Sequence, residues 1–298
     1  MILELAKKLE FPTDAAICAD RIYWQLASNP TVMNKLYEAM DLLYDTEGKE
    51  YVEKLNEVPP IEGISPYTVH LIFALMCAHT TRYLYIQNGL PESLYWETMM
   101  DIRYKLMECH NVHGVWGLFV IQWYGDFFRC KRFKLGRLQY ERREFPYESY
   151  GPHLKQGDRV YNCHIPSCGP VTRESVMDSL KKAHQFFRNE LKDGILPIFC
   201  SSWMLYPPHA KKVFAPDSNL QHFYELFDIL EQIERPENSD YWRIFNTPYS
   251  KEALADAPTD TSLRRSFKQF LQEGNSMGVG KGIFLFDGEQ LLPPPTTP

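Results

Sequence analysis

Apolar residues in the first part of the chain recur at the spacing of amphipathic helices. Ser65 followed by Pro66 predicts a helix start, because serine caps free N–H groups and proline suits the first turn. The apolar positions that follow are Val69, Ile72, Phe73 and Met76. The predicted helix ends at Asn88-Gly89, and Asn29-Pro30 gives the same start signal for an earlier helix.

A further helix is predicted after Pro91, with Leu94, Met99, Ile102 and Leu106 along its apolar side. The aromatic segment from residue 115 to residue 128 has the length of a helix and is predicted to be buried in a core. A pair of strands is the alternative for that segment. These elements predict a helical N-terminal domain over residues 1–128.

Strands and helices alternate in the rest of the chain. The hydrophobic pattern predicts strands at residues 135–143, 160–165, 195–205 and 283–286. Helices are predicted to begin at residues 172–175 and at Ser218 or Asn219, the second continuing to Leu230. The glycine-rich residues 278–282 are predicted to be a flexible turn. This order predicts an α/β (α+β) domain with a mixed sheet over residues 129–298.

Charge supports the same division. Residues 1–128 carry 9 Lys and Arg against 17 Asp and Glu, whereas residues 129–298 carry 23 against 21. The overall charge of −6 argues against a nucleic-acid partner. The basic run between residues 129 and 143 is predicted to be a solvated strand face, with nucleic acid or an acidic substrate as the alternative.

The composition predicts a cytoplasmic protein that does not act at a membrane. No apolar run approaches the roughly 18 residues of a membrane-spanning helix. Charges at Glu4, Lys7, Lys8 and Glu10 interrupt any signal-peptide core. Seven widely spaced cysteines do not form a disulfide framework. The Cys/His clusters at residues 109–113 and 163–168 lack zinc-finger spacing, so no metal is predicted.

The most informative segment is residues 160–183, which is predicted to run from a strand through a Gly/Pro loop into a helix. The N-terminus of a helix offers free N–H groups and a positive dipole end, which together can hold phosphate. Gly169 allows close backbone approach, and Arg173 could add a charge-assisted contact. The alternative is an ordinary capped helix. A Walker loop is excluded because the GxxxxGK[ST] pattern is absent.

Several segments of the second half resemble a divergent bacterial branch of the GCN5-related N-acetyltransferase (GNAT) superfamily. The segments are CHIP at residues 163–166, Gly169-Pro170, Ser175, Asp178-Ser179, Ala183, FCSSWML at residues 199–205, Ser218-Asn219 and LGRLQYE at residues 135–141. In that branch a helical N-terminal domain precedes an acetyltransferase-like domain. The resemblance implies a GNAT-like acyl-CoA N-acyltransferase fold for residues 129–298.

The resemblance also implies a binding site for acyl-CoA, which serves as the co-substrate. Acyl-CoA would lie in a wedge between two parallel strands, residues 161–165 and 198–203, with its pyrophosphate on residues 168–174. A backbone N–H near His164 or Ile165 would polarise the thioester carbonyl. The implied CoA-binding residues are Cys163, His164, Ile165, Cys168, Gly169, Val171, Thr172, Arg173, Ser202 and Asn219. The loop departs from the superfamily pattern, with one glycine and two prolines.

Three residues are candidates for the chemistry. The resemblance implies Tyr224 as the acid that protonates the leaving thiolate, although its motif is two residues shorter than usual. Glu141 and His164 are candidate bases for the acyl acceptor. The alternatives are a packing tyrosine, a surface carboxylate paired with Arg142 or Arg143, and a core histidine.

The predicted function is transfer of an acyl group, expected to be acetyl, from acyl-CoA to an unidentified small-molecule or peptide acceptor, expected to be an amine. The alternative is a GNAT-like binding or regulatory module without catalysis. A third possibility is a structural domain without a ligand. The sequence does not indicate an oligomeric state.

Overall fold

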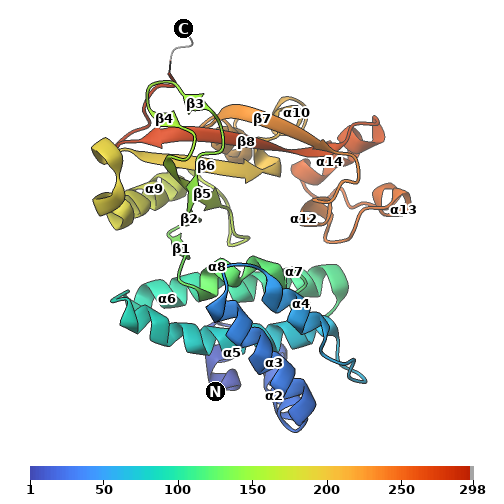
Figure 1. Ribbon diagram of the computed structural model, residues 1–298. Helices are drawn as coiled ribbons and strands as arrows, with labels where there is room; N and C mark the ends of the chain where they lie inside the picture. The colour runs from blue at the N-terminus through green and yellow to red at the C-terminus, as the bar shows by residue number, and fades with distance from the viewer. Residues whose placement is uncertain (296–298) are drawn as a thin grey trace. The chain divides into compact units, whose positions relative to one another are not determined.

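The structure is a computed structural model that describes residues 1–295. The chain divides into two compact units, Met1–Lys134 and Leu135–Pro298, coloured blue to green and green to red in Figure 1. The first unit is helical and the second contains a sheet with helices. The family fold expected from the sequence, a helical region followed by a GNAT-like mixed-sheet domain, is confirmed.

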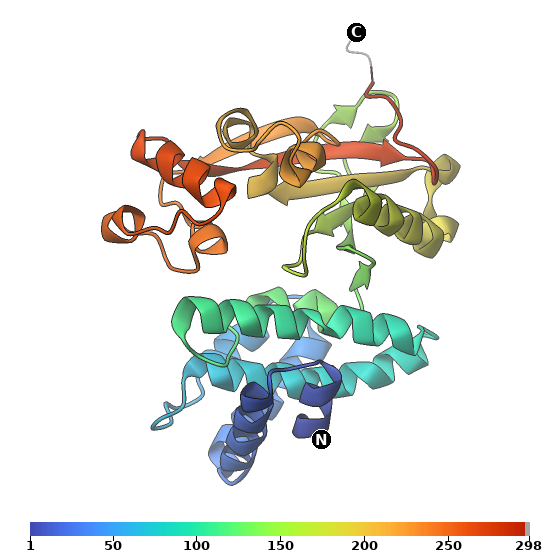
Figure 2. The ribbon, with the colours of Figure 1, turned by 180° about the vertical axis from the view of Figure 1, so that it is seen from behind.

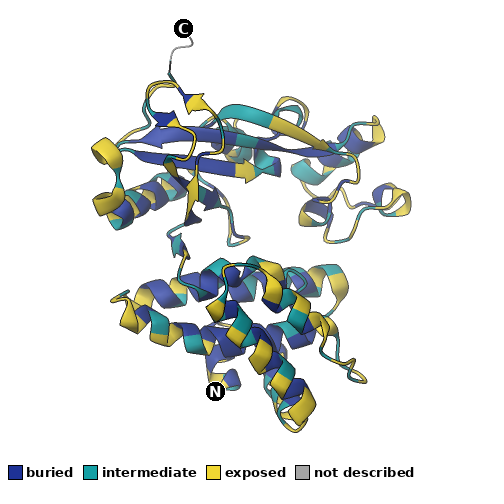
Figure 3. Cartoon of the chain, in the orientation of Figure 1, coloured by how far each residue is buried: buried dark blue, intermediate teal, exposed yellow. Residues whose placement is uncertain are grey.

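The helices of the first unit begin where capping residues stand. Asn29 Oδ1 accepts a hydrogen bond from the N–H of Thr31, and Ser65 Oγ accepts one from the N–H of Tyr67. The elements are α1 (Ile2–Lys8), α2 (Thr13–Ala27), α3 (Pro30–Asp45), α4 (Glu50–Asn56), α5 (Pro66–Gln87), α6 (Glu92–Met99), α7 (Asp101–His113), η1 (Ile121–Trp123) and α8 (Gly125–Phe128). The predicted helix from 66 to Asn88 is confirmed as α5, and its middle is fully buried (Figure 3). Among the described residues, no helix combines the length and the apolar character that crossing a membrane requires.

Two predictions in this unit were wrong. Residues 115–128 do not form one helix. Gly117 packs against Tyr67, where a Cβ would lie 2.5 Å from the backbone of Tyr67. The N–H of Leu118 donates to the carbonyl of Tyr67 at 2.8 Å, which holds the segment as a loop before η1 and α8. The helix predicted after Pro91 is two helices, α6 and α7, which meet at Met100.

The second unit is built on a mixed sheet with the strand order β1-β2-β5-β6-β8-β7. Its strands are β1 (Arg132–Leu135), β2 (Leu138–Glu144), β5 (Arg159–His164), β6 (Leu196–Ser202), β7 (Asp228–Arg235) and β8 (Met277–Phe286). A separate hairpin contains β3 (Ser149–Tyr150) and β4 (Leu154–Lys155). β5 and β6 run parallel, whereas β2 with β5, β6 with β8 and β7 with β8 run antiparallel.

Helices complete the second unit. They are α9 (Arg173–Phe187), η2 (Arg188–Glu190), η3 (Lys192–Gly194), η4 (Trp203–Leu205), α10 (Pro207–Lys212), α11 (Asn219–Tyr224), α12 (Trp242–Phe245), α13 (Lys251–Ala255) and α14 (Ser262–Gln272). Of these, α9 lies along one face of the sheet in Figure 2, where the ring centroids of Phe187 and of Tyr161 on β5 are 4.3 Å apart. α9 begins within residues 172–175 as predicted, and Thr172 caps it.

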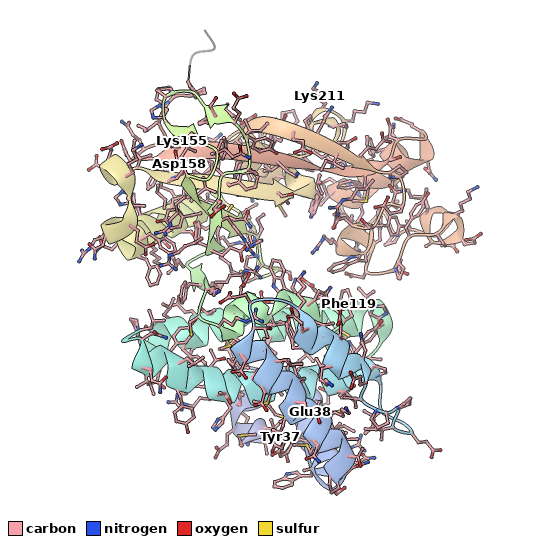
Figure 4. All side chains as sticks on the ribbon, in the orientation of Figure 1. Tyr37, Glu38, Phe119, Lys155, Asp158 and Lys211 are labelled. Carbon is pink, nitrogen blue, oxygen red and sulfur yellow. The ribbon has the colours of Figure 1, made fainter. Side chains whose placement is uncertain are left out.

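The β3–β4 hairpin packs on the face of the sheet opposite α9 (Figure 1). Its residues Tyr150 and Leu154 join Val160, Phe199 and Ile283 in one buried cluster. The N–H of Lys155 donates to Asp158 Oδ2 at 2.9 Å, which closes the turn into β5 (Figure 4).

The strand and helix predictions after residue 190 need three corrections. The strand predicted at residues 195–205 ends at Ser202, and residues 203–205 form η4. The helix predicted from Ser218 to Leu230 ends at Tyr224, and Leu230 lies in β7, a strand that was not predicted. The glycine-rich residues 278–282 are the middle of β8 and not a turn, and Figure 3 shows this strand almost entirely buried.

Close packing explains why glycines occupy β8. A Cβ on Gly280 would lie 1.9 Å from the carbonyl oxygen of Leu205, and one on Gly282 would lie 2.9 Å from the Cβ of Phe227. A backbone atom cannot rotate away as the end of a side chain can. Glycine is therefore required for the approach of η4 to the sheet.

We expect Gly280→Ala to destabilise the protein by about 3 kcal/mol, since overpacking against backbone forces a main-chain shift. Gly282→Ala, on the same strand and with a less severe clash, is the matched comparison and should cost less. Urea unfolding followed by circular dichroism measures both. Equal stability of the two variants would contradict this account of β8.

Candidate functional site

The parallel strands β5 and β6 separate at their carboxyl ends. In the parallel pairing of these strands, Tyr161 lies opposite Ile198 and Asn162 opposite Phe199. Beyond these pairs, β5 continues to His164 and β6 to Ser202. Each strand stays paired with its other neighbour over that distance, β5 with β2 and β6 with β8. The wedge between adjacent parallel strands that the sequence resemblance implied is therefore present.

A buried polar cluster lies beside this wedge, on the side of β5 that pairs with β2. Glu141 of β2 lies opposite Asn162 of β5, so their side chains share one face with His164 two residues further on. Asn162 Nδ2 donates to Glu141 Oε1 at 3.0 Å, and His164 Nε2 lies 3.0 Å from the same oxygen. The side chains of Glu141 and His164 are 3% and 18% exposed, so the pair is screened little by solvent.

The carboxylate of Glu141 also accepts a hydrogen bond from Arg143 Nε at 2.9 Å. The pairing with Arg143 was the structural alternative for Glu141, and it is present together with the contact to His164. Asn162 Nδ2 also lies 3.1 Å from His164 Nε2, so the donor and acceptor roles around this ring nitrogen depend on the tautomer of the imidazole.

The loop after β5 leads into α9, whose first turn is capped by a side chain as in the alternative of an ordinary capped helix. Thr172 Oγ1 accepts from the N–H of Ser175 at 3.2 Å, and Gly169 has φ +117°, a conformation that favours glycine. The pKa of Glu174 is lowered by a hydrogen bond from its own backbone N–H and by another from Thr172. An acidic side chain therefore already occupies part of this helix N-terminus.

A cavity of about 240 Å³ lies between α9 and α11. The α9 side contributes Val171, Arg173, Val176, Met177 and Leu180, and the α11 side contributes His222, Phe223, Glu225 and Leu226. Its walls are largely apolar and its polar groups lie on both helices. Two of the predicted CoA-binding residues, Val171 and Arg173, therefore line one cavity.

The other predicted residues do not line this cavity. Ser202 Oγ accepts from the N–H of Met204, and Asn219 is the first residue of α11, which Ser218 caps. Cys163 is buried, and its thiol pKa is raised by a contact with the Cys200 thiol and by burial. Ile165 and Cys168 belong to the loop before α9. No group of residues in the described part of the chain could hold a metal ion.

Tyr224 lies at the end of α11 and packs against an aromatic cluster that includes Trp203 and Phe267. Burial raises the pKa of its hydroxyl. Its neighbours on both sides, Phe223 and Glu225, line the cavity between α9 and α11. The role of Tyr224 as general acid remains a prediction.

Arg137 was predicted to lie in the basic run of a solvated strand face and was not among the predicted site residues. Arg137 instead donates to three backbone carbonyls of the loop between β5 and α9. The available signal in the sequence was Gly136, directly before Arg137, because glycine favours tight hairpin turns. In the structure Gly136 has φ +74°, and Arg137 follows it in the turn.

Comparison with known families identifies the class of protein. The profile of the GNAT-like C-terminal domain matches residues 133–284, just over half of the chain, and that of the N-acyltransferase N-terminal domain matches residues 2–130. The chain therefore belongs to the family of proteins with this GNAT-like C-terminal domain. No curated protein matches the sequence.

Solved structures share the fold. An acyltransferase in complex with decanoyl-CoA and teicoplanin is 21% identical, with a TM-score of 0.72 over 98% of this chain and 88% of that one. An acyltransferase in complex with decanoyl-CoA gives 0.73 at 21% identity over 95% and 86%. A mutant acyltransferase in complex with octanoyl-CoA gives 0.71 at the same identity and coverage.

Proposed function

We propose that the protein transfers an acyl group from acyl-CoA to an amine acceptor. The observation that carries this proposal is the buried Glu141–Asn162–His164 cluster beside the wedge between β5 and β6. Family membership supports the acyl-CoA co-substrate, and the cavity between α9 and α11 offers room for part of the CoA arm.

The chemistry follows from these groups. The amine nitrogen attacks the thioester carbonyl, the new C–N bond forms, the C–S bond breaks, and CoA leaves as a thiolate. In this proposal the imidazole of His164 accepts the proton that the amine loses, and the Glu141 carboxylate, 3.0 Å from Nε2, stabilises the resulting imidazolium. A backbone N–H at His164 or Ile165 would stabilise the developing oxyanion. Tyr224 is the sequence-based candidate to protonate the thiolate.

The donor is proposed to be acetyl-CoA, as the sequence resemblance implies. The similar solved structures hold octanoyl-CoA and decanoyl-CoA, so chain length is tested by comparing kcat/KM for the acetyl, octanoyl and decanoyl donors. A tenfold preference for a longer chain would exclude acetyl-CoA as the preferred donor.

Binding of CoA is the direct test. At 100 times its Kd, CoA should stabilise the fold by about 2.7 kcal/mol, which raises the melting temperature. Arg173→Ala should weaken this stabilisation while the melting temperature without ligand stays near that of the wild type, because Arg173 is an exposed residue at the rim of the cavity. The absence of any shift with millimolar CoA would contradict the proposal.

The second candidate function is a module that binds CoA without catalysis. The observation that favours it is the loop itself, in which Pro170 supplies no N–H and the Glu174 carboxylate lies at the helix N-terminus. Tight CoA binding with no release of free thiol from acyl-CoA, across a panel of amines, would support this alternative.

A further inference from the structure

Arg137 holds the loop between β5 and α9 in one conformation. It lies in the turn that connects β1 to β2 and is half-buried. Its Nη1 donates to the carbonyl of Pro166 at 2.9 Å, Nη2 to that of Gly169 at 2.6 Å, and Nε to that of Pro170 at 3.0 Å. One guanidinium therefore fixes three peptide units of a short loop.

The carbonyl directions determine where the loop presents its N–H groups. In a trans peptide the N–H points opposite to the carbonyl of the preceding residue. Because the carbonyls of Pro166 and Pro170 point toward Arg137, the N–H groups of Ser167 and Val171 point away from it. The carbonyl of Gly169 is followed by Pro170, which has no N–H. The loop thus presents the N–H of Val171 on the side opposite the guanidinium, and Val171 also lines the cavity between α9 and α11.

A loop with two prolines and one glycine has few conformations, and it needs an external partner to satisfy its carbonyls. Gly169 has φ +117°, and a Cβ there would meet no neighbouring atom. Glycine is therefore needed at this position for the backbone conformation and not to avoid a steric clash. The guanidinium supplies the partner and adds a positive charge beside the loop. A loop fixed in this way binds an anion without a further loss of conformational entropy.

We propose that Arg137 is a positioning residue that orders this loop for the diphosphate of CoA, in place of the several glycines usual in the superfamily. The inference rests on the proposed function, since it requires that the protein binds CoA. It assigns to Arg137 a role in recognition of the diphosphate and none in the chemical step.

The experiment compares two donors that differ in the diphosphate. Acetyl-CoA carries it, whereas acetyl-pantetheine has the same thioester and lacks it. In Arg137→Ala the KM for acetyl-CoA should rise roughly ten- to hundredfold, because three charge-assisted hydrogen bonds are lost. The kcat/KM for acetyl-pantetheine should stay within about twofold. Arg137→Lys should show the same split, since an ammonium group cannot bond three carbonyls in one plane.

Arg142→Ala is the matched control. Arg142 lies on β2 and its guanidinium bonds Glu190 Oε1 and Oε2 at 2.6 and 2.8 Å, away from the loop after β5. In Arg142→Ala we expect the kinetic constants for acetyl-CoA and for acetyl-pantetheine to equal those of the wild type. Arg137→Lys carries the comparison alone if Arg137→Ala does not fold, as judged by circular dichroism.

The outcomes separate the inference from the function it rests on. If Arg137→Ala and the wild type bind CoA equally in calorimetric titration, the inference is overturned and the proposed function stands. An equal loss for acetyl-CoA and acetyl-pantetheine assigns Arg137 to overall stability and also overturns it. If the wild type binds no CoA, the proposed function fails and the inference fails with it.

Discussion

Replacing His164 with alanine should lower kcat by about 10²–10⁴-fold and leave the Kd for CoA nearly unchanged. In the proposed mechanism the imidazole accepts the proton of the acceptor amine, and its Nε2 lies 3.0 Å from the buried Glu141 carboxylate. The effect should appear in the chemical step, so it is measured under single-turnover conditions with saturating acetyl-CoA.

Glu141→Gln is the companion variant. The amide keeps the shape of the side chain but cannot stabilise an imidazolium, so kcat should fall here as well. Because the two residues act as a unit, the double variant should be little slower than either single one. Asn162→Ala, which removes a hydrogen bond to Glu141 without removing the base, serves as the control and should have a smaller effect. Additive losses in His164→Ala and Glu141→Gln would refute a shared role.

Capping and turn residues in the sequence correctly predicted the helix ends that neighbouring residues determine. The Ser65-Pro66 start and the Asn88-Gly89 end defined α5, and the Thr172 cap defined the start of α9. The segment at residues 115–128 was mistaken for a helix because its apolar pattern was read without Gly117, which long-range packing on Tyr67 requires.

The candidate site depended on the register between strands far apart in the chain. Glu141 and His164 were each proposed from the sequence, but nothing local shows that Glu141 lies opposite Asn162 and so reaches His164 two residues on. Arg137 was missed for the same reason, since its partners are carbonyls about 30 residues away. The glycines of β8 were interpreted as a turn, because the sequence alone does not show that Leu205 packs against Gly280.

The free energy of unfolding should fall by about 2 kcal/mol between pH 7.5 and pH 5 because of His209 alone. Its side chain is fully buried among aromatic rings, with the ring centroid of Phe267 at 4.9 Å, and Nδ1 lies 2.8 Å from the carbonyl oxygen of Trp203. Burial lowers the pKa of His209 from 6.5 to about 4, against smaller opposing effects of Trp203 and Asp240.

The sign follows from the two protonation states. The unfolded chain binds a proton at His209 near pH 6.5, whereas the folded protein does so only near pH 4. The stabilisation is therefore fully present above pH 6.5 and is lost as the pH falls toward 4. Protonating His209 in the folded state would place a charge in an apolar aromatic cluster, so unfolding becomes the easier way to accept the proton.

His209→Gln isolates this contribution, because the amide can still donate to the carbonyl of Trp203 and does not titrate. Urea unfolding at pH 7.5 and at pH 5 should show a loss in this variant that is smaller by about 2 kcal/mol than in the wild type. His79→Gln, at an exposed position on α5, should retain the full wild-type loss. If the free energy of unfolding depends on pH identically in His209→Gln and in the wild type, burial does not lower the pKa of His209.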